Sequence, residues 1–422
     1  MHQPAPAARP FFGWHVVTAT FVLATFGWGV GFYGPPVFLY AVVAQTGWPV
    51  AMVSMAVTAH FLLGAVVVSN LPRLYRHSGV PAVTTAGAGL LALGIAGWAL
   101  AAEPWQLFLS ALASGAGWVT MGAAAVNALV APWFDRRRPA ALGMAYNGAS
   151  LGGAIFSPLW IAVIAGVGFV PASLAIGGVM VIVVVLLSVL VFRHTPESLG
   201  QHPDGREGAR FPDQALRNAS PLRHSILRDR RCVTLAAGMT LGLFAQIGLL
   251  AHLVSLLVPV LGEGVTGIAM GGATLAAILG RSMVGWVMPA SADRRLVASA
   301  SYGVQVAGSL LFILSAGDGG AWLLLGIVLF GLGIGNATSL PPLIAQQEFT
   351  PAETARVVPM IVAIGQAGYA FAPAAFGLLR GQEGTGAAGS EMLFACAAAI
   401  QLAAIGCILA GRRGGPGKRE RA

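Results

Sequence analysis

The sequence is poor in charged residues. Of its 422 residues only 9% are charged, whereas 56% are hydrophobic and the mean hydropathy is +0.77. A soluble globular protein carries about 25% charged residues. A water-soluble chain of this length could not bury so much apolar surface. We therefore predict an integral membrane protein whose excess apolar side chains face the lipid bilayer.

The signatures of an enzyme or a metalloprotein are also absent. The sequence has no H-E-x-x-H and no phosphate-binding loop of the type G-x-x-x-x-G-K-[ST]. Its three cysteines, Cys232, Cys396 and Cys407, lie in or beside apolar segments, with a spacing that fits neither a metal site nor a disulfide framework. We expect no enzyme, no cofactor and no metal. The first apolar stretch is too long for a cleavable signal peptide.

The formal net charge of +9 does not point to nucleic acid, because the cations cluster at helix ends and in one linker without interleaved aromatic residues. Membrane helices explain the sequence better. About 20 mostly apolar residues cross the hydrocarbon core, and the sequence predicts twelve such spans, all α-helical. They cover residues 13–42, 50–71, 79–101, 105–132, 139–165, 168–192, 232–260, 264–289, 296–316, 321–346, 355–379 and 389–411.

The loop cations predict the orientation, because cytoplasmic loops are enriched in arginine and lysine. With the N-terminus inside, the opposite side keeps only Arg380. We therefore expect both termini in the cytoplasm. The cytoplasmic side then collects Arg73, Arg76, Arg136, Arg137, Arg138, Arg294, Arg295, Arg356, the linker and the tail.

The chain is expected to form two similar halves. A polar linker over 193–231 separates an N-terminal six-helix bundle, 1–192, from a C-terminal six-helix bundle, 232–411, which a basic tail, 412–422, follows. Residues 134–159 align without a gap with 349–374, so that Phe134 meets Phe349 and Gly153 meets Gly368. Repeated halves are typical of transporters that bind substrate near the membrane midplane.

Several stretches give the sequence a resemblance to a known family. They are "FFGWHVV", "WFDRRRPAALGMAYNGASLGGAIFSPL", "HTPESLGQHPDG", "GLLAHLVSLLVPVLGEG" and "LGRSMVGW". With the two six-helix halves, they resemble the major facilitator superfamily, and within it the bacterial monocarboxylate porters and oxalate/formate antiporters. The resemblance implies a monomeric carrier of the bacterial inner membrane, with gating loops after helices four and eight. The gating candidates are Asp135, Arg136, Arg137, Arg138 and Asp293.

The sequence also departs from this family. The loop after helix two reads "LPRLYRHSG", with Arg76 where the superfamily has an acid. Ala277 stands where monocarboxylate porters tend to carry an acid before the helix-eight arginine, and the only lysine is Lys418. The gating contacts that these residues normally build are therefore expected to be altered.

Arg281 is the strongest site candidate, because an intramembrane charge costs at least about 2.5 kcal/mol and is rarely kept without a function. Its guanidinium could grip a substrate carboxylate with two parallel hydrogen bonds. The alternative is an arginine that snorkels to helix-end carbonyls or supports the inner gate. His252 and His60 are candidates for carrying a proton, although a histidine on an apolar helix often only links helices. The further substrate-binding candidates are His252, Tyr33, Asn127, Gln246, Tyr146 and Asn147.

No acidic residue falls in the interior of a predicted span. Proton coupling would therefore run through a histidine, through a substrate carried in its protonated form, or not occur. Two functions remain open: a carrier for a small organic anion, with a co-transported proton or an exchanged anion, and an efflux carrier for amphiphilic compounds. Multidrug carriers commonly use a membrane-embedded acid, which favours the anion carrier.

Overall fold

The computed structural model describes residues 11–205, 228–289, 291–315, 320–381 and 387–412, and every regular element within them is a helix. The N-terminal half contains α1 (Gly13–Gly31), α2 (Gly34–Thr46), α3 (Val50–Ser78), α4 (Val80–Leu100), α5 (Pro104–Trp118), α6 (Ala123–Val130), α7 (Arg138–Val167) and α8 (Phe169–Leu187). The C-terminal half contains α10 (Arg230–Val287), α11 (Arg294–Leu314), α12 (Gly320–Glu348), α13 (Pro351–Tyr369), α14 (Ala372–Gly381) and α15 (Ala387–Ala410). Short 3-10 or π turns are η1 (Val119–Met121), η2 (Ala131–Trp133), η3 (Ser188–Phe192), η4 (Glu197–Leu199) and η5 (Pro203–Gly205).

Eleven helical segments in the described residues are long and apolar enough to cross a membrane. The longest, α10, has 58 residues. At 1.5 Å per residue it would extend about 87 Å, nearly three times the thickness of the hydrocarbon core. Gly262 divides it, since its φ of 74° is left-handed and non-helical. If α10 is counted as two membrane passes, the ten other segments bring the total in the described residues to twelve. The two passes of α10 are separated by one non-helical residue, whereas the sequence suggested a short loop.

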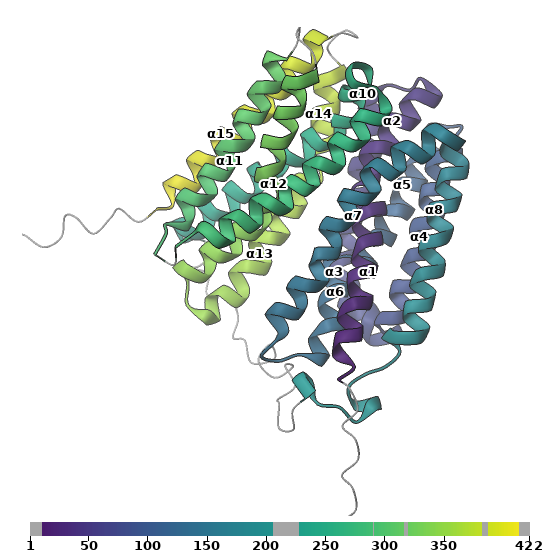
Figure 1. The fold of residues 1–422 in the computed structure, drawn as a ribbon, viewed down its shortest axis with the longest axis vertical. Helices are drawn as coiled ribbons and strands as arrows, with labels where there is room; N and C mark the ends of the chain where they lie inside the picture. Colours follow the sequence, from purple (N-terminus) through teal and green to yellow (C-terminus); the bar gives the residue numbers. More distant parts are fainter. Residues whose placement is uncertain (1–10, 206–227, 290, 316–319, 382–386, 413–422) are drawn as a thin grey trace, which may run out of the picture.

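The two halves form two helical bundles that lie side by side and diverge toward the end where η4 and η5 lie (Figure 1). We call this the basic end, because it carries the arginine-rich loops that predict the cytoplasmic side. The buried core of each bundle is apolar. Most of the predicted linker, 206–227, and the tail after Arg412 lie outside the described residues.

The bundles contact each other mainly toward the opposite end, where α10 packs on α7 and α2, and α14 packs on α3. The approach of α10 to α7 is close at Gly271, where a Cβ would lie 3.0 Å from the Ala154 carbonyl oxygen. At the α3–α14 contact, the Ala374 backbone N–H donates to Thr58 Oγ1 over 3.0 Å. Tyr40 on α2 donates to Glu263 on α10 over 3.3 Å. These contacts close the space between the bundles at the end away from the basic loops.

Candidate functional site

A cavity of about 490 Å³ lies between the two bundles and is lined by residues from both. Part of its lining lies toward the basic end and comes from Val68 on α3, Arg281 on α10 and Thr338 on α12. The Thr338 side chain is exposed. Toward the opposite end lies a much smaller cavity of about 30 Å³, lined almost wholly by apolar side chains. The cavity is therefore accessible from the predicted cytoplasmic side and closed on the other.

Three broken helices meet at this cavity. The α1–α2 break exposes Phe32 and Tyr33 to it, because Pro35 cannot donate a hydrogen bond and disrupts the preceding helical turn. The α5–α6 break brings Gly122 to the cavity wall, and the α13–α14 break follows Tyr369. Discontinuous helices are a common source of substrate sites in secondary transporters, since they leave backbone groups beside the cavity.

Arg281 projects from α10 into the cavity. It lies six residues before Val287, the last residue of α10, which is about 9 Å at 1.5 Å per residue. Its stem passes close to α12, since a Cβ on Gly335 would lie 3.1 Å from Arg281 Cβ. Arg281 Nη2 donates to Ser150 Oγ on α7 over 2.9 Å, a hydrogen bond that joins the two halves.

The Arg281 guanidinium has no acidic partner among the described residues. A guanidinium offers five N–H donors, and in the described part of the chain only the bond to Ser150 satisfies them. The side chain is half-buried. Its remaining donors are thus available to a ligand in the cavity.

Three other predicted candidates line the same cavity: Tyr33, Tyr146 and Gln246. Tyr33 approaches Thr274 of the C-terminal half, because both side chains lie against Gly153. A Cβ on Gly153 would lie 2.5 Å from Tyr33 Cζ and 2.7 Å from Thr274 Cγ2. Gln246 Oε1 accepts a hydrogen bond from Gln305 over 3.3 Å. The cavity is therefore polar on parts of both halves.

Asn127 and Asn147 lie outside the cavity lining. Asn127 Nδ2 donates to the Tyr146 hydroxyl over 2.6 Å and to the Ala123 carbonyl over 2.9 Å. Its place is behind Tyr146, whose ring it holds against α6. Asn147 is exposed on α7, one residue beyond Tyr146 and therefore on a different face of the helix.

Both histidine candidates are buried, and neither lines the cavity. His60 Nε2 lies 2.9 Å from the Gly31 carbonyl oxygen and Nδ1 lies 2.8 Å from Ser114 Oγ, so both ring nitrogens have partners. His252 Nε2 donates to the Pro373 carbonyl over 3.0 Å, whereas its Nδ1 has no hydrogen-bond partner in the described structure. Both imidazoles link helices, and their proposed role in proton coupling stays a prediction.

The predicted gating residues after helix four lie at the exposed surface of the basic end. Asp135, Arg136 and Arg137 are exposed, and Arg138 begins α7. The linker folds back onto them, since Asp204 Oδ2 accepts from the Arg136 backbone N–H over 2.7 Å. The first part of the linker is thereby fastened to the N-terminal bundle.

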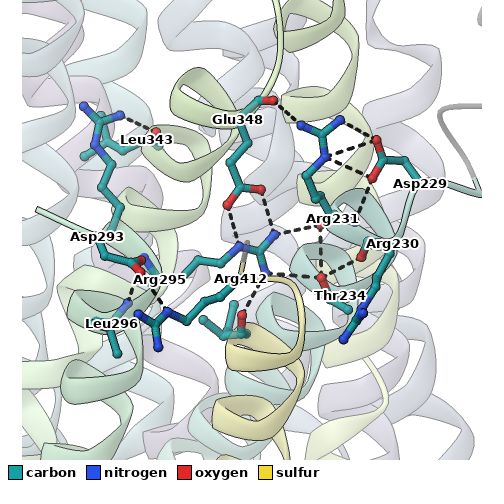
Figure 2. Close-up of polar contacts among 12 residues, drawn as sticks. Asp229, Arg230, Arg231, Thr234, Asp293, Arg295, Leu296, Leu343, Glu348 and Arg412 are labelled. Atoms are coloured by element: carbon teal, nitrogen blue, oxygen red, sulfur yellow. Dashed lines mark hydrogen bonds and ion pairs between the residues drawn. The ribbon is translucent and has the colours of Figure 1, made fainter. Parts of the chain in front are cut away.

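Asp293 is the N-cap of α11. Its Oδ1 accepts hydrogen bonds from the backbone N–H of Arg295 over 2.9 Å and from that of Leu296 over 3.3 Å. Its Oδ2 accepts a hydrogen bond from Arg412 Nε over 2.7 Å (Figure 2). Partial burial alone would raise the pKa of this carboxyl group, but the bonds from Arg412 and the helix N-terminus outweigh it and lower the pKa below its usual value. Asp293 thus ties the end of α15 to the start of α11.

Next to it lies a buried ion pair between Glu348 and Arg295, which the sequence showed only as a loop cation. Arg295 is 2% exposed, and it donates to Glu348 from Nε over 2.6 Å and from Nη2 over 2.8 Å (Figure 2). Its other donors reach Thr234 Oγ1 and the carbonyl oxygens of Arg231 and Ile408. Arg295 therefore fastens α10, α11, α12 and α15 together, a role that spacing along the chain does not reveal.

Ser150 was not predicted as a partner of Arg281. Tyr146 and Ser150 are four residues apart on α7 and therefore share a face, which was the available signal. The aromatic lining residues Phe61 and Trp118 gave no such signal, because one apolar ring in a membrane helix looks like any other.

An all-helical membrane protein with a central cavity between two bundles has the architecture of a carrier. The family model for the Major Facilitator Superfamily matches residues 13–373. The chain belongs to this superfamily of transporters. None of the curated proteins matches the sequence significantly.

Solved structures with the same fold include a mutant of the nucleoside transporter NupG, with 13% identity, a TM-score of 0.71 and coverage of 94% of this chain and 100% of that one. A bacterial homolog of the human lysosomal transporter Spinster, inward-facing and occupied, has 13% identity and a TM-score of 0.67, with 96% and 97% coverage. Its inward-facing, unoccupied form has 14% identity and a TM-score of 0.65, with 96% and 98% coverage. At these identities the likeness shows the fold alone.

Proposed function

We propose that the protein is a carrier for a small organic anion, in particular a monocarboxylate, and that Arg281 binds the carboxylate. It would move this anion across the bacterial inner membrane by alternating access, as a monomer and as a secondary or facilitative transporter. The observation that carries the proposal is an arginine in the cavity between the halves that has no acidic partner among the described residues.

The energetics of buried arginines support this assignment. Burying a guanidinium is costly unless an anion compensates it. The charge of Arg295 is compensated by Glu348, with 2.6 Å between Nε and Oε1. The charge of Arg231 is compensated by Asp229, with 2.7 Å between Nη2 and Oδ2. In the described part of the chain, Arg281 has only a serine hydroxyl. A substrate carboxylate would supply the missing charge and could accept two parallel hydrogen bonds from the guanidinium.

The position of Arg281 also suits alternating access. Because its partner Ser150 belongs to the other bundle, a carboxylate bound here would contact both halves at once. A ligand shifts a conformational equilibrium only through interactions that differ between the two states. An anion that bridges α7 and α10 meets this requirement.

The test is uptake into liposomes that contain the purified protein. We expect saturable uptake of radiolabelled monocarboxylates by the wild type and its loss in Arg281→Ala. The matched control is Arg73→Ala, which removes an exposed arginine at the basic end of α3. Equal uptake by wild type and Arg281→Ala would contradict the assignment. Running the assay with and without a pH gradient tells whether a proton is co-transported.

A second candidate function is efflux of amphiphilic compounds. It is favoured by the aromatic side chains that line the cavity, among them Trp28, Phe61 and Trp118. Resistance on overexpression that persists in Arg281→Ala would support this function over the first.

A further inference from the structure

We propose that the preferred substrates are monocarboxylates with an aromatic body, and that short acids such as acetate bind much more weakly. This inference rests on the proposed function, since it assigns the carboxylate to Arg281. It adds a second recognition element, an aromatic wall formed by Trp28, Phe32, Phe61, Trp118, Tyr146 and Tyr369.

The aromatic wall is continuous. The ring centroids of Tyr146 and Trp28 are 6.2 Å apart, those of Trp28 and Trp118 are 6.2 Å apart, and those of Trp118 and Phe32 are 6.0 Å apart. Phe61 extends the series, at 5.9 Å from Phe32 and 5.9 Å from Tyr369. These distances fall in the range of favourable aromatic pairs.

The wall is not simply part of a closed core. All six side chains line the cavity, and Trp28, Phe32 and Tyr146 remain only half-buried. Apolar surface beside a cavity gains free energy when a ligand covers it, because water leaves both surfaces. An aromatic ligand can also take the edge-to-face arrangement that Trp28 already adopts with Trp118 and with Tyr146.

The cavity offers a single full charge. Among the described lining residues Arg281 is the one charged side chain, and Ser150, Gln246 and Gln366 are neutral. A second carboxylate on the substrate would therefore lose its contact with water without gaining a cation in the cavity, which costs free energy. This pattern selects one carboxylate with an uncharged remainder.

The volume agrees with a substrate larger than the shortest acids. At about 490 Å³, the cavity lies within the range of roughly 300–1,000 Å³ found for sites that enclose drug-sized ligands. Acetate or lactate would occupy only a small part of it and would leave the aromatic wall in contact with water. An acid with one aromatic ring would reach from the guanidinium toward the wall.

The experiment is calorimetric titration of the purified full-length protein in detergent. The probes are phenylacetate, acetate, the neutral phenylacetamide and the dicarboxylate phenylsuccinate. We expect phenylacetate to bind at least tenfold more tightly than acetate, and phenylacetamide and phenylsuccinate to bind weakly. Arg281→Ala should abolish binding of both monocarboxylates.

Variants of the wall separate its contribution from that of Arg281. Trp28→Leu and Phe61→Leu should each weaken phenylacetate binding several-fold and leave acetate binding unchanged. The matched control is Trp105→Leu, because Trp105 is 64% exposed and lies outside the cavity lining. Two wall variants are used so that one poorly folded protein, detected by size-exclusion chromatography, does not decide the result.

The possible outcomes distinguish the two proposals. If acetate binds as tightly as phenylacetate in an Arg281-dependent manner, the aromatic preference is wrong and the anion carrier stands. If phenylacetamide binds as tightly as phenylacetate and Arg281→Ala changes neither, the carboxylate assignment itself is wrong. If neither acid binds to the wild type, both proposals fail.

Discussion

Arg281 on α10 and Ser150 on α7 are joined by a hydrogen bond of 2.9 Å across the cavity between the two bundles. This bond links the one charged lining residue of the described cavity to the opposite half of the protein. Because the serine is neutral, the contact positions the guanidinium without compensating its charge. The arginine is held in place and still able to bind an anion.

The first prediction concerns the relative weight of these two residues. Arg281→Lys keeps the positive charge but loses the planar pair of donors, so uptake efficiency, kcat/KM, should fall at least tenfold. Ser150→Ala removes one hydrogen bond, which contributes about 1 kcal/mol, so the fall should stay near fivefold. Initial rates of uptake over a range of substrate concentrations measure both. A larger loss in Ser150→Ala than in Arg281→Lys would show that the serine, and not the arginine, governs binding.

Much of the fold followed from the sequence for a physical reason. Lipid forces every span to be a long apolar helix, so spans such as Val80–Leu100 are evident from hydropathy alone. The break in α10 was also predicted, between the spans 232–260 and 264–289. The structure differs in its form, because the turn is made at one left-handed glycine, Gly262, and not in a short loop.

The site was only partly predictable. Arg281 could be identified because a charge in a membrane helix is rare. Asn127 and His252 are also polar residues in membrane helices. Their side chains face away from the cavity, however, toward Tyr146 and Pro373 respectively. Spacing along the sequence shows which residues share one face of a helix. It does not show which other helix or cavity that face contacts. The aromatic wall joins residues of α1, the α1–α2 break, α3, α5, α7 and α13, and only the tertiary packing brings them together.

The second prediction concerns the buried pair Arg295–Glu348. Glu348→Gln leaves Arg295, which is 2% exposed, without a counter-charge. This should destabilise the protein by about 3 kcal/mol. Thermal unfolding in detergent measures the loss, with Glu197→Gln as the control because Glu197 is an exposed acid in the linker. The double variant Arg295→Met with Glu348→Gln should recover part of the loss. An unchanged unfolding temperature in Glu348→Gln would mean that the pair does not hold the four helices together.

The third prediction concerns pH and Asp293. Its pKa is below the usual carboxyl value, because bonds from Arg412 and the α11 N-terminus outweigh the effect of burial. A group with a lowered folded-state pKa stabilises the fold above its unfolded pKa, about 3.9, and loses that effect as pH falls through the folded value. Asp293→Asn keeps an N-cap oxygen but removes the charge. At pH 7 the variant should be less stable by under about 1 kcal/mol, since this pair is partly exposed.

That difference should shrink as the pH falls below about 4, where the carboxyl group of the unfolded chain begins to take up a proton, and should vanish once the pH has fallen through the lower pKa of the folded state. Thermal unfolding of wild type and Asp293→Asn over a series of pH values tests it. The exposed Asp135→Asn, at the other basic-end loop, serves as the control. A stability gap that stays constant down to about pH 3, below the usual carboxyl pKa, would contradict the role of the charge.

The fourth prediction concerns closure of the end opposite the basic loops. Thr58 accepts a hydrogen bond from the Ala374 N–H, which joins α3 to α14. Thr58→Val keeps the shape but leaves that N–H unpaired, at a cost of about 1 kcal/mol or more, so the ratio of closed to open molecules should fall about fivefold. Spin labels at Gln45→Cys and Val265→Cys, in a chain without its native cysteines, should report longer distances. Thr25→Val is the control, because the Thr25 hydroxyl bonds within its own helix. An unchanged distance distribution in Thr58→Val would show that packing of α14 on α3 closes this end without the hydrogen bond.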